Sequence, residues 1–172
     1  LMVLISDILD LSKIESNTME FNFCNISLHQ VLNEIGSAQS MNMKKGVELL
    51  LDFPGQEVAI YTDPTRLSQV INNLVNNAIK FTSEGNIRIG YRPAASDCVN
   101  IFVEDTGTGM SKEVIEHIFD RFYKGDAFKQ GTGLGLAICR TIVERFKGKI
   151  EVASTPGKGT RFTIILPLKV EE

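Results

Sequence analysis

The run Asp105-Thr106-Gly107-Thr108-Gly109 combines a carboxylate with two closely spaced glycines. A carboxylate at the end of a strand accepts hydrogen bonds from an exocyclic amine, such as that of adenine. Glycines two and four positions later allow a flat ring to approach the backbone. The alternative is a tight turn capped by the aspartate, and the run alone does not decide between the two.

Asn73 and Asn77 lie one helical turn apart, so their amide oxygens can be directed to the same point. Mg²⁺ prefers oxygen ligands and keeps several waters, so one amide together with phosphate oxygens suffices to hold it. The segment 72–77 holds four asparagines in six positions, although asparagine is a mediocre helix former. Some of these amides are therefore predicted to have a function, and a structural role for the pair is the alternative.

Two further glycine clusters are Gly131-Thr132-Gly133-Leu134-Gly135, directly before a predicted helix, and Gly157-Lys158-Gly159-Thr160, within a predicted hairpin. The first offers a flexible backbone at a helix N-terminus, where free N–H groups favour phosphate. It lacks the Lys-Ser/Thr ending of a P-loop and the strand-turn-helix context of a Rossmann site. Each cluster alone is weak evidence, because glycines also simply permit turns.

The asparagines must be positioned by a helix that is predicted to run from Asp63 to Phe81. Asp63 is a capping carboxylate, and Pro64 suits the first helical position. Asn72 and Asn76 are predicted to point toward solvent. A polar stripe beside the apolar core face comprises Arg66, Gln69, Asn73, Asn77 and Lys80.

The remaining elements are predicted from apolar periodicity and turn signals. Alternation predicts two hairpins, 87–92 with 99–104 and 150–153 with 160–166. Short apolar runs flank a Pro54-Gly55 turn at 47–53 and 58–62. Three further helices are predicted. The first runs from Ser27 to Gly46, where Ser27 forms a capping box with Gln30. The second begins at Ser111 and the third runs from Leu134 to about Lys147; the second has on one side Ile115, Ile118, Phe119 and Phe122. This order favours an α+β fold, a two-layer α/β sandwich with a mixed sheet and helices packed on one face.

Residues 1–16 are predicted to form a separate helix with an apolar seam of Leu1, Leu4, Ile8 and Leu11. Its other side is expected to stay wet through Asp7, Asp10, Lys13 and Glu15. Asn17 can end the helix in the left-handed conformation. The segment opens in apolar sequence without a cap, which predicts a helix that is cut partway along and whose packing partner lies outside this chain. An amphipathic helix docked on its own domain is the alternative.

Composition excludes several classes of protein. The 172 residues carry 18 Lys+Arg and 21 Asp+Glu, a net charge of −3, which argues against a general nucleic-acid binder. No apolar run is long enough for a membrane span. The three cysteines are odd in number and form no CxxC, so buried thiols in a reducing compartment are expected rather than a metal site.

Several segments resemble the conserved boxes of sensor histidine kinases, in the family's order and spacing. Residues 73–81 resemble the N box, 105–109 the first glycine box, 119–122 the F box, 131–136 the second glycine box and 157–162 the closing hairpin. Residues 4–15 resemble the end of the second helix of the dimerisation and phosphotransfer domain. The resemblance implies two units, a partial dimerisation helix over 1–20 and a catalytic ATP-binding domain over 21–172.

The resemblance implies the ATP-binding sandwich shared with type II topoisomerase ATPases, MutL-type repair proteins and the large heat-shock chaperone. It implies a protein-histidine kinase that uses ATP and Mg²⁺ and donates the γ-phosphoryl group to a histidine. Asp105 would bind the adenine amino group, Asn77 would ligate Mg²⁺ with help from Asn73, and Lys80 would approach the phosphates. The other implied nucleotide-binding residues are Gly107, Gly109, Arg121, Lys124, Gly131, Thr132, Gly133, Leu134, Gly135 and Thr160.

The resemblance also implies partners and a location. The implied partners are a second copy of the protein in a homodimer, the phosphotransfer helices of the same protein and a response regulator receiver domain, with no nucleic acid. The implied location is the cytoplasmic portion of a membrane-anchored sensor. In the family an acidic residue follows the acceptor histidine, whereas here Gln30 follows His29 and Ile118 follows His117. The acceptor is therefore expected upstream. The alternatives are a degenerate nucleotide-binding interaction module and another ATPase of the same fold.

Overall fold

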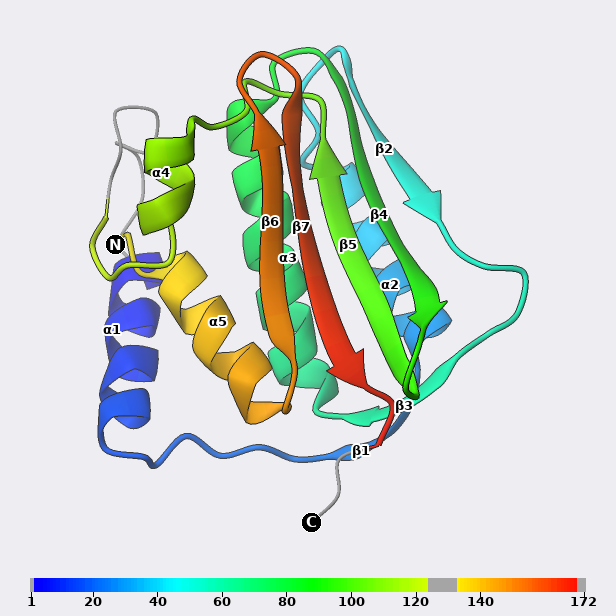
Figure 1. Ribbon diagram of the computed structural model, residues 1–172, viewed down its shortest axis with the longest axis vertical. Coiled ribbons are helices and arrows are strands. Elements are labelled where there is room, and N and C mark those ends of the chain that lie inside the picture. Colours follow the sequence, from blue (N-terminus) through cyan, green and yellow to red (C-terminus); the bar gives the residue numbers. More distant parts are fainter. Residues whose placement is uncertain (1, 124–132, 170–172) are drawn as a thin grey trace.

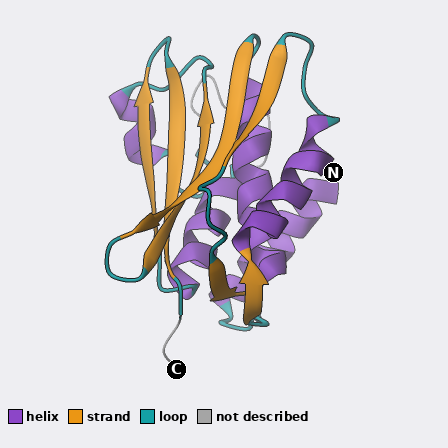
Figure 2. Ribbon diagram, turned by 90° about the vertical axis from the view of Figure 1, so that its right-hand side faces the viewer, coloured by secondary structure: helices purple, strands orange, loops and turns teal. Residues whose placement is uncertain are grey.

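A five-stranded sheet covered by helices on one face forms the body of the protein, as the computed structural model shows for residues 2–123 and 133–169 (Figures 1 and 2). The strand order is β2-β4-β5-β7-β6. β2 runs parallel to β4, whereas the other neighbours are antiparallel. The strands are β2 (Val47–Asp52), β4 (Gly85–Ala94), β5 (Cys98–Asp105), β6 (Lys149–Thr155) and β7 (Gly159–Pro167). The predicted α+β sandwich with a mixed sheet is confirmed.

The helices α2 (Leu28–Ser40), α3 (Pro64–Phe81) and α5 (Gly135–Arg145) pack side by side behind the sheet (Figure 1). α1 (Met2–Glu15) lies outside α5, and the short α4 (Lys112–His117) lies at the same side of the molecule. Among the described residues no helix combines the length and the apolarity that a bilayer crossing requires.

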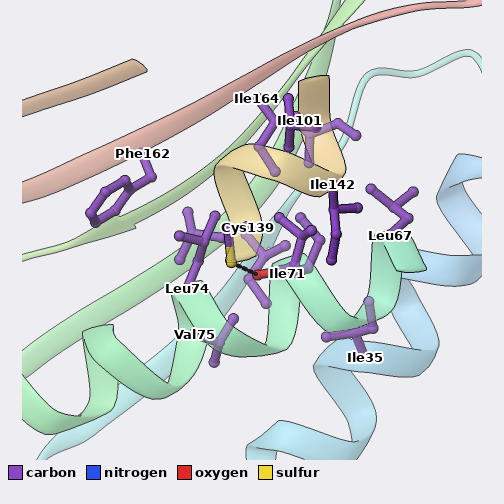
Figure 3. Packing of buried hydrophobic residues seen from close by; sticks show 14 of the residues in the cluster. Ile35, Leu67, Ile71, Leu74, Val75, Ile101, Cys139, Ile142, Phe162 and Ile164 are labelled. Atoms are coloured by element: carbon purple, nitrogen blue, oxygen red, sulfur yellow. Dashed lines mark hydrogen bonds between the residues drawn. The ribbon is translucent and has the colours of Figure 1, made fainter. Parts of the chain in front are cut away.

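α3 is the central helix, and its local signals explain its bounds. The Asp63 carboxylate accepts hydrogen bonds from the backbone N–H groups of Thr65, at 2.9 Å, and Arg66, at 3.1 Å. Its buried face meets α5 in the core, where the Cys139 thiol is directed at the backbone oxygen of Val70, 3.9 Å away (Figure 3). Burial raises the pKa of Cys139 to about 12. The expectation of three buried thiols is met only by Cys139, because Cys24 is exposed and Cys98 is partly exposed.

The two apolar runs around Pro54-Gly55 do not pair with each other. β2 joins the large sheet, while β3 (Ala59–Thr62) pairs with β1 (Cys24–Ser27) in a separate two-stranded sheet. α2 ends at Ser40, before the predicted Gly46, which instead precedes β2 with a φ of +87°.

The predictions for the start of α2 and for the apolar face of α4 are only partly right. The Gln30 backbone N–H donates to Ser27 Oγ at 3.2 Å, but the Gln30 amide bonds Glu34 instead of completing the capping box. Ser111 caps α4 as predicted, accepting from the Val114 N–H. Phe122 lies beyond α4, is 60% exposed and has a φ of +60°, so it does not continue the apolar face of that helix.

The face of α1 that is buried differs in part from the face that the sequence predicts. Asn17 ends the helix with a φ of +56°, as expected. However, Asp7 and Asp10 are buried. The polar stripe of α3 reaches Asp10, which accepts from Gln69 Nε2 at 2.7 Å and from Arg66 Nη1 at 3.5 Å. The expectation that these aspartates stay wet is wrong. Most apolar residues of α1 are exposed instead, namely Met2, Val3, Leu4, Ile5, Ile8 and Leu9. Leu11 and Ile14 are partly buried against the core.

Candidate functional site

Three segments that are distant in the sequence meet at one end of the sheet, at the top of Figure 1. They are the C-terminal end of α3, the loop after β5 and the β6–β7 turn. The Thr108 N–H donates to the Phe81 carbonyl at 3.1 Å, and the Gly157 N–H donates to the Thr108 carbonyl at 2.7 Å. Backbone hydrogen bonds therefore join all three segments into one unit.

A small cavity of about 20 Å³ lies between these segments. Its lining residues are Asn77, Phe81, Asp105, Gly109, Met110, Thr160 and Phe162. Asn77 of α3 and Asp105 of β5 thus line the same cavity. The space suffices for about one water molecule, so a base ring enters only as side chains shift, and the flexible Met110 side chain is suited to such a movement.

Asp105 is a carboxyl group held in place by the backbone. Its side chain accepts from the Gly107 N–H, with Oδ1 at 2.9 Å, and from the Thr160 N–H. Only 8% of the residue is exposed. Loss of solvation raises the pKa of Asp105, and the two backbone donors oppose that shift. The site therefore contains a desolvated carboxyl group that gains from a further hydrogen-bond donor.

Gly107 and Gly109 allow the chain's own backbone to pack closely. A Cβ atom at Gly107 would lie 2.2 Å from the Phe81 carbonyl oxygen, and one at Gly109 would lie 2.1 Å from the Thr155 carbonyl oxygen. The sequence suggested that these glycines make room for a flat ring. The structure supplies a different reason for them, because they permit the joined unit of α3, the β5 loop and the hairpin.

Asn73 lies one turn before Asn77 and faces α5. Its Nδ2 donates to Cys139 Sγ at 3.5 Å and lies 3.9 Å from the place that a Cβ atom of Gly135 would occupy. α5 begins at Gly135, and Leu134 provides no side-chain cap for its first N–H groups. The N-terminus of α5, a favourable place for phosphate, therefore lies against the polar stripe of α3.

The four asparagines of α3 divide into two pairs. Gln39 of α2, which is 6% exposed, donates to Asn72 Oδ1 at 2.8 Å and to Asn76 Oδ1 at 3.2 Å. Asn76 is exposed, as predicted, and Asn72 is partly buried. Through these bonds the two asparagines also tie α3 to α2, a role that was not predicted. Gln39 was missed by sequence reasoning. The sequence signal that could have revealed Gln39 is its position four residues after Ile35, which places a polar side chain on the apolar face of α2.

The remaining predicted residues are placed as follows. Lys80 lies in the last turn of α3, where loss of solvation lowers its pKa. Thr160 lines the cavity, and Gly133 precedes α5. Arg121 donates to Glu15 Oε1 of α1 at 2.6 Å. Lys124, Gly131 and Thr132 lie outside the described residues.

A larger crevice of about 830 Å³ opens between α1 and α3. Asn73 lines it together with Asp7, Asp10, Arg66 and Gln69, whereas Asn77 and Asp105 are not among its lining residues. Within it Asp10 already pairs with Arg66 and accepts a hydrogen bond from Gln69 across the two helices. The small cavity therefore remains the candidate site.

The model of the family described as histidine kinase-, DNA gyrase B-, and HSP90-like ATPase matches residues 62–170, which include every residue lining the small cavity. The chain belongs to this family. It therefore carries an ATP-binding domain of the ATPase type, as the resemblance of its boxes implied.

Sensor histidine kinases are among the proteins that are similar to this chain. RcsC of Escherichia coli strain K12 is 41% identical over 98% of this chain, and YclK of Bacillus subtilis strain 168 is 34% identical over 98%. The chain spans only 18% of RcsC and 37% of YclK.

Solved structures of histidine kinases share the fold. Full-length ShkA in complex with AMPPNP matches 98% of this chain and 36% of its own, with a TM-score of 0.89 and 25% identity. The catalytic domain of ThkA matches 87% of this chain and 99% of its own, with a TM-score of 0.75 and 29% identity. The fold of this family member is thus that of histidine kinase catalytic domains.

Proposed function

We propose that this chain is the catalytic ATP-binding part of a sensor histidine kinase, which binds Mg-ATP and donates its γ-phosphoryl group to a histidine on a dimerisation domain. The observation that carries the proposal is that Asn77 and Asp105 line one cavity. The names of RcsC and YclK, and the AMPPNP complex of ShkA, support the choice of this activity among those of the family.

In this proposal Asp105 accepts a hydrogen bond from the adenine amino group, and Asn77 supplies an amide oxygen to Mg²⁺. An amide oxygen fits Mg²⁺, which takes hard oxygen ligands and retains waters. When bound, the ion neutralises charge on the phosphates. Asn73 and Lys80 assist on the phosphate side. The site is completed by Gly107, Gly109, Arg121, Lys124, Gly131, Thr132, Gly133, Leu134, Gly135 and Thr160.

The decisive test mixes the chain with the acceptor helices of the full-length protein and γ-labelled ATP. Phosphoryl transfer depends mainly on positioning, so a kinase is expected to label the acceptor histidine in trans. A degenerate module would bind ATP without transferring label. An ATPase clamp would dimerise with ATP and release phosphate, and either of these results would overturn the proposal.

The pH dependence of binding is a consequence of the raised Asp105 pKa. The ionised carboxylate accepts the amine, so affinity is complete above the raised pKa and is lost as pH falls through it. Adenosine, which has no phosphate to titrate, is expected to weaken about tenfold per pH unit below that point. The loss should begin above the usual aspartate pKa of 3.8. A calorimetric or NMR titration that stays flat until the usual value would contradict the assignment.

We further propose that residues 1–20 are the end of a dimerisation helix and that residues 21–172 form the catalytic domain. The partners would be a second copy of the protein, its phosphotransfer helices and a receiver domain. We place this arrangement in the cytoplasmic portion of a membrane-anchored sensor. The names of the relatives as sensor histidine kinases support the sensor role. The exposed apolar side of α1 supports the dimer.

The outward face of α1 should make the chain self-associate as its concentration rises. Ile5 and Leu9 are 51% and 56% exposed, so Ile5→Glu with Leu9→Glu is expected to abolish association in light scattering. Met41→Glu, at an 87% exposed residue after α2, is the matched control and should leave association unchanged. A wild-type chain that remains monomeric at all concentrations would refute this role of α1.

A further inference from the structure

Ser154 of β6 lies behind the cavity wall and contacts three groups that shape it. Its Oγ lies 2.8 Å from the Met110 backbone nitrogen, 3.0 Å from the Gly159 carbonyl oxygen and 2.8 Å from Thr160 Oγ1. Met110 and Thr160 line the cavity. Ser154 thus connects the β5 loop, the β6–β7 hairpin and a cavity side chain through one hydroxyl group.

The donor and acceptor capacities of these groups decide where the protons lie. A serine hydroxyl has one proton and two lone pairs, a backbone N–H only donates, and a carbonyl only accepts. Ser154 must therefore donate to the Gly159 carbonyl and accept from the Met110 N–H. Its remaining lone pair accepts the hydroxyl proton of Thr160. All three hydrogen bonds form together only in this arrangement, which leaves Thr160 Oγ1 as an acceptor toward the cavity.

The surrounding backbone leaves little freedom to rearrange this pattern. The Gly157 N–H is bonded to the Thr108 carbonyl at 2.7 Å, so the hairpin and the β5 loop cannot separate independently. A Cβ atom at Gly159 would lie 2.0 Å from the Asp105 carbonyl oxygen, which shows how closely β7 and the end of β5 approach. Asp105 and Thr160 are also direct cross-strand partners. Two acceptors, a carboxylate and a hydroxyl oxygen, therefore stand side by side at the cavity.

We propose that Ser154 is a specificity-determining residue: by holding the proton of Thr160, it makes this wall of the cavity accept hydrogen bonds only. Such a wall favours a purine with an amino group at position 6 and disfavours one with a carbonyl there, because a carbonyl oxygen finds no donor. The inference rests on the proposed function and adds the residue that enforces selection of the base. Ser154 acts through Thr160 and does not itself line the cavity.

The test compares ATP with inosine triphosphate, which has the same sugar and phosphates but a carbonyl at position 6. The Ser154→Ala change frees the Thr160 proton to donate into the cavity. The ratio of the two dissociation constants, measured by calorimetry, is expected to move about tenfold toward inosine triphosphate, the effect of about one hydrogen bond. Ser154→Thr retains the hydroxyl and should restore the wild-type ratio.

A structural role alone would weaken both nucleotides equally and leave the ratio unchanged, and that result would overturn the inference. A second arm uses Thr160→Val, which removes the proton in question. In that background Ser154→Ala should leave the ratio where it is, and an undiminished tenfold change there would also refute the role through Thr160. A wild-type chain that binds neither nucleotide would overturn the proposed function as well, whereas normal ATP binding with an unmoved ratio would overturn this inference alone.

Discussion

Replacement of Asp105 by alanine will weaken ATP binding by about 10- to 100-fold, which is the effect of losing about 1.5–3 kcal/mol from a hydrogen bond to a charged group. The Gly107 and Thr160 N–H groups hold the carboxylate in place, and alanine removes the acceptor together with both of these hydrogen bonds. Calorimetric titration of ATP into the variant measures the change directly.

The control is Glu104→Ala, at the preceding residue of the same strand. Successive side chains of a strand point to opposite faces, and Glu104 pairs with Arg161 at 3.0 Å outside the cavity. This variant should bind ATP as the wild type does. Unchanged affinity in Asp105→Ala, with a normal unfolding transition, would remove Asp105 from the site.

Replacement of Asn77 by alanine will abolish the dependence of ATP binding on Mg²⁺. Without the amide oxygen, affinity in the presence of the metal should fall to the level measured with a chelator. Phosphoryl transfer to the acceptor helices should slow by about 100-fold or more, because electrostatic stabilisation dominates this reaction. Titrations with and without Mg²⁺, together with single-turnover transfer of label, provide the measurement.

Asn76→Ala is the matched control for Asn77→Ala, since the two residues are adjacent and of the same type. Asn76 bonds Gln39 of α2 and does not line the cavity. Its replacement should lower stability slightly and preserve the Mg²⁺ dependence. Equal loss of that dependence in both variants would indicate that α3 responds as a whole and that Asn77 has no distinct role.

Local signals account for the parts of the fold that the sequence predicted well. The Asp63-Pro64 start of α3 and the left-handed Asn17 after α1 depend only on neighbouring residues, as do the two hairpins. The pairing of β1 with β3 and the parallel contact of β2 with β4 join distant segments, and the Pro54-Gly55 signal gave no information about either. α1 shows the same limit, because the burial of Asp10 depends on Arg66 and Gln69 of α3.

The site was predictable to the extent that residue type reveals chemistry. The pattern singled out Asp105 and Asn77, and the structure brings both to one cavity. The role of Ser154 could not be predicted, because it arises from three partners that meet only in the folded chain. A Cβ atom at Gly107 or Gly109 would meet backbone atoms of a neighbouring segment, a packing requirement that the sequence pattern did not reveal. The approach of a flat ring to these glycines stays a prediction.

The electrostatics of the site indicate function as well. Loss of solvation raises the pKa of Asp105 and lowers that of Lys80, two groups near the same end of the sheet. Each shift disfavours the charged form of its group. Such perturbed groups concentrate at binding and catalytic sites.

The most direct test of the account is a crystal structure of the chain with Mg²⁺ and a non-hydrolysable ATP analogue. The account predicts one nucleotide whose adenine amino group lies on the Asp105 carboxylate and whose metal ion is bound by the Asn77 amide oxygen. A nucleotide seated in the crevice between α1 and α3, or one that contacts only one of these two side chains, would contradict it.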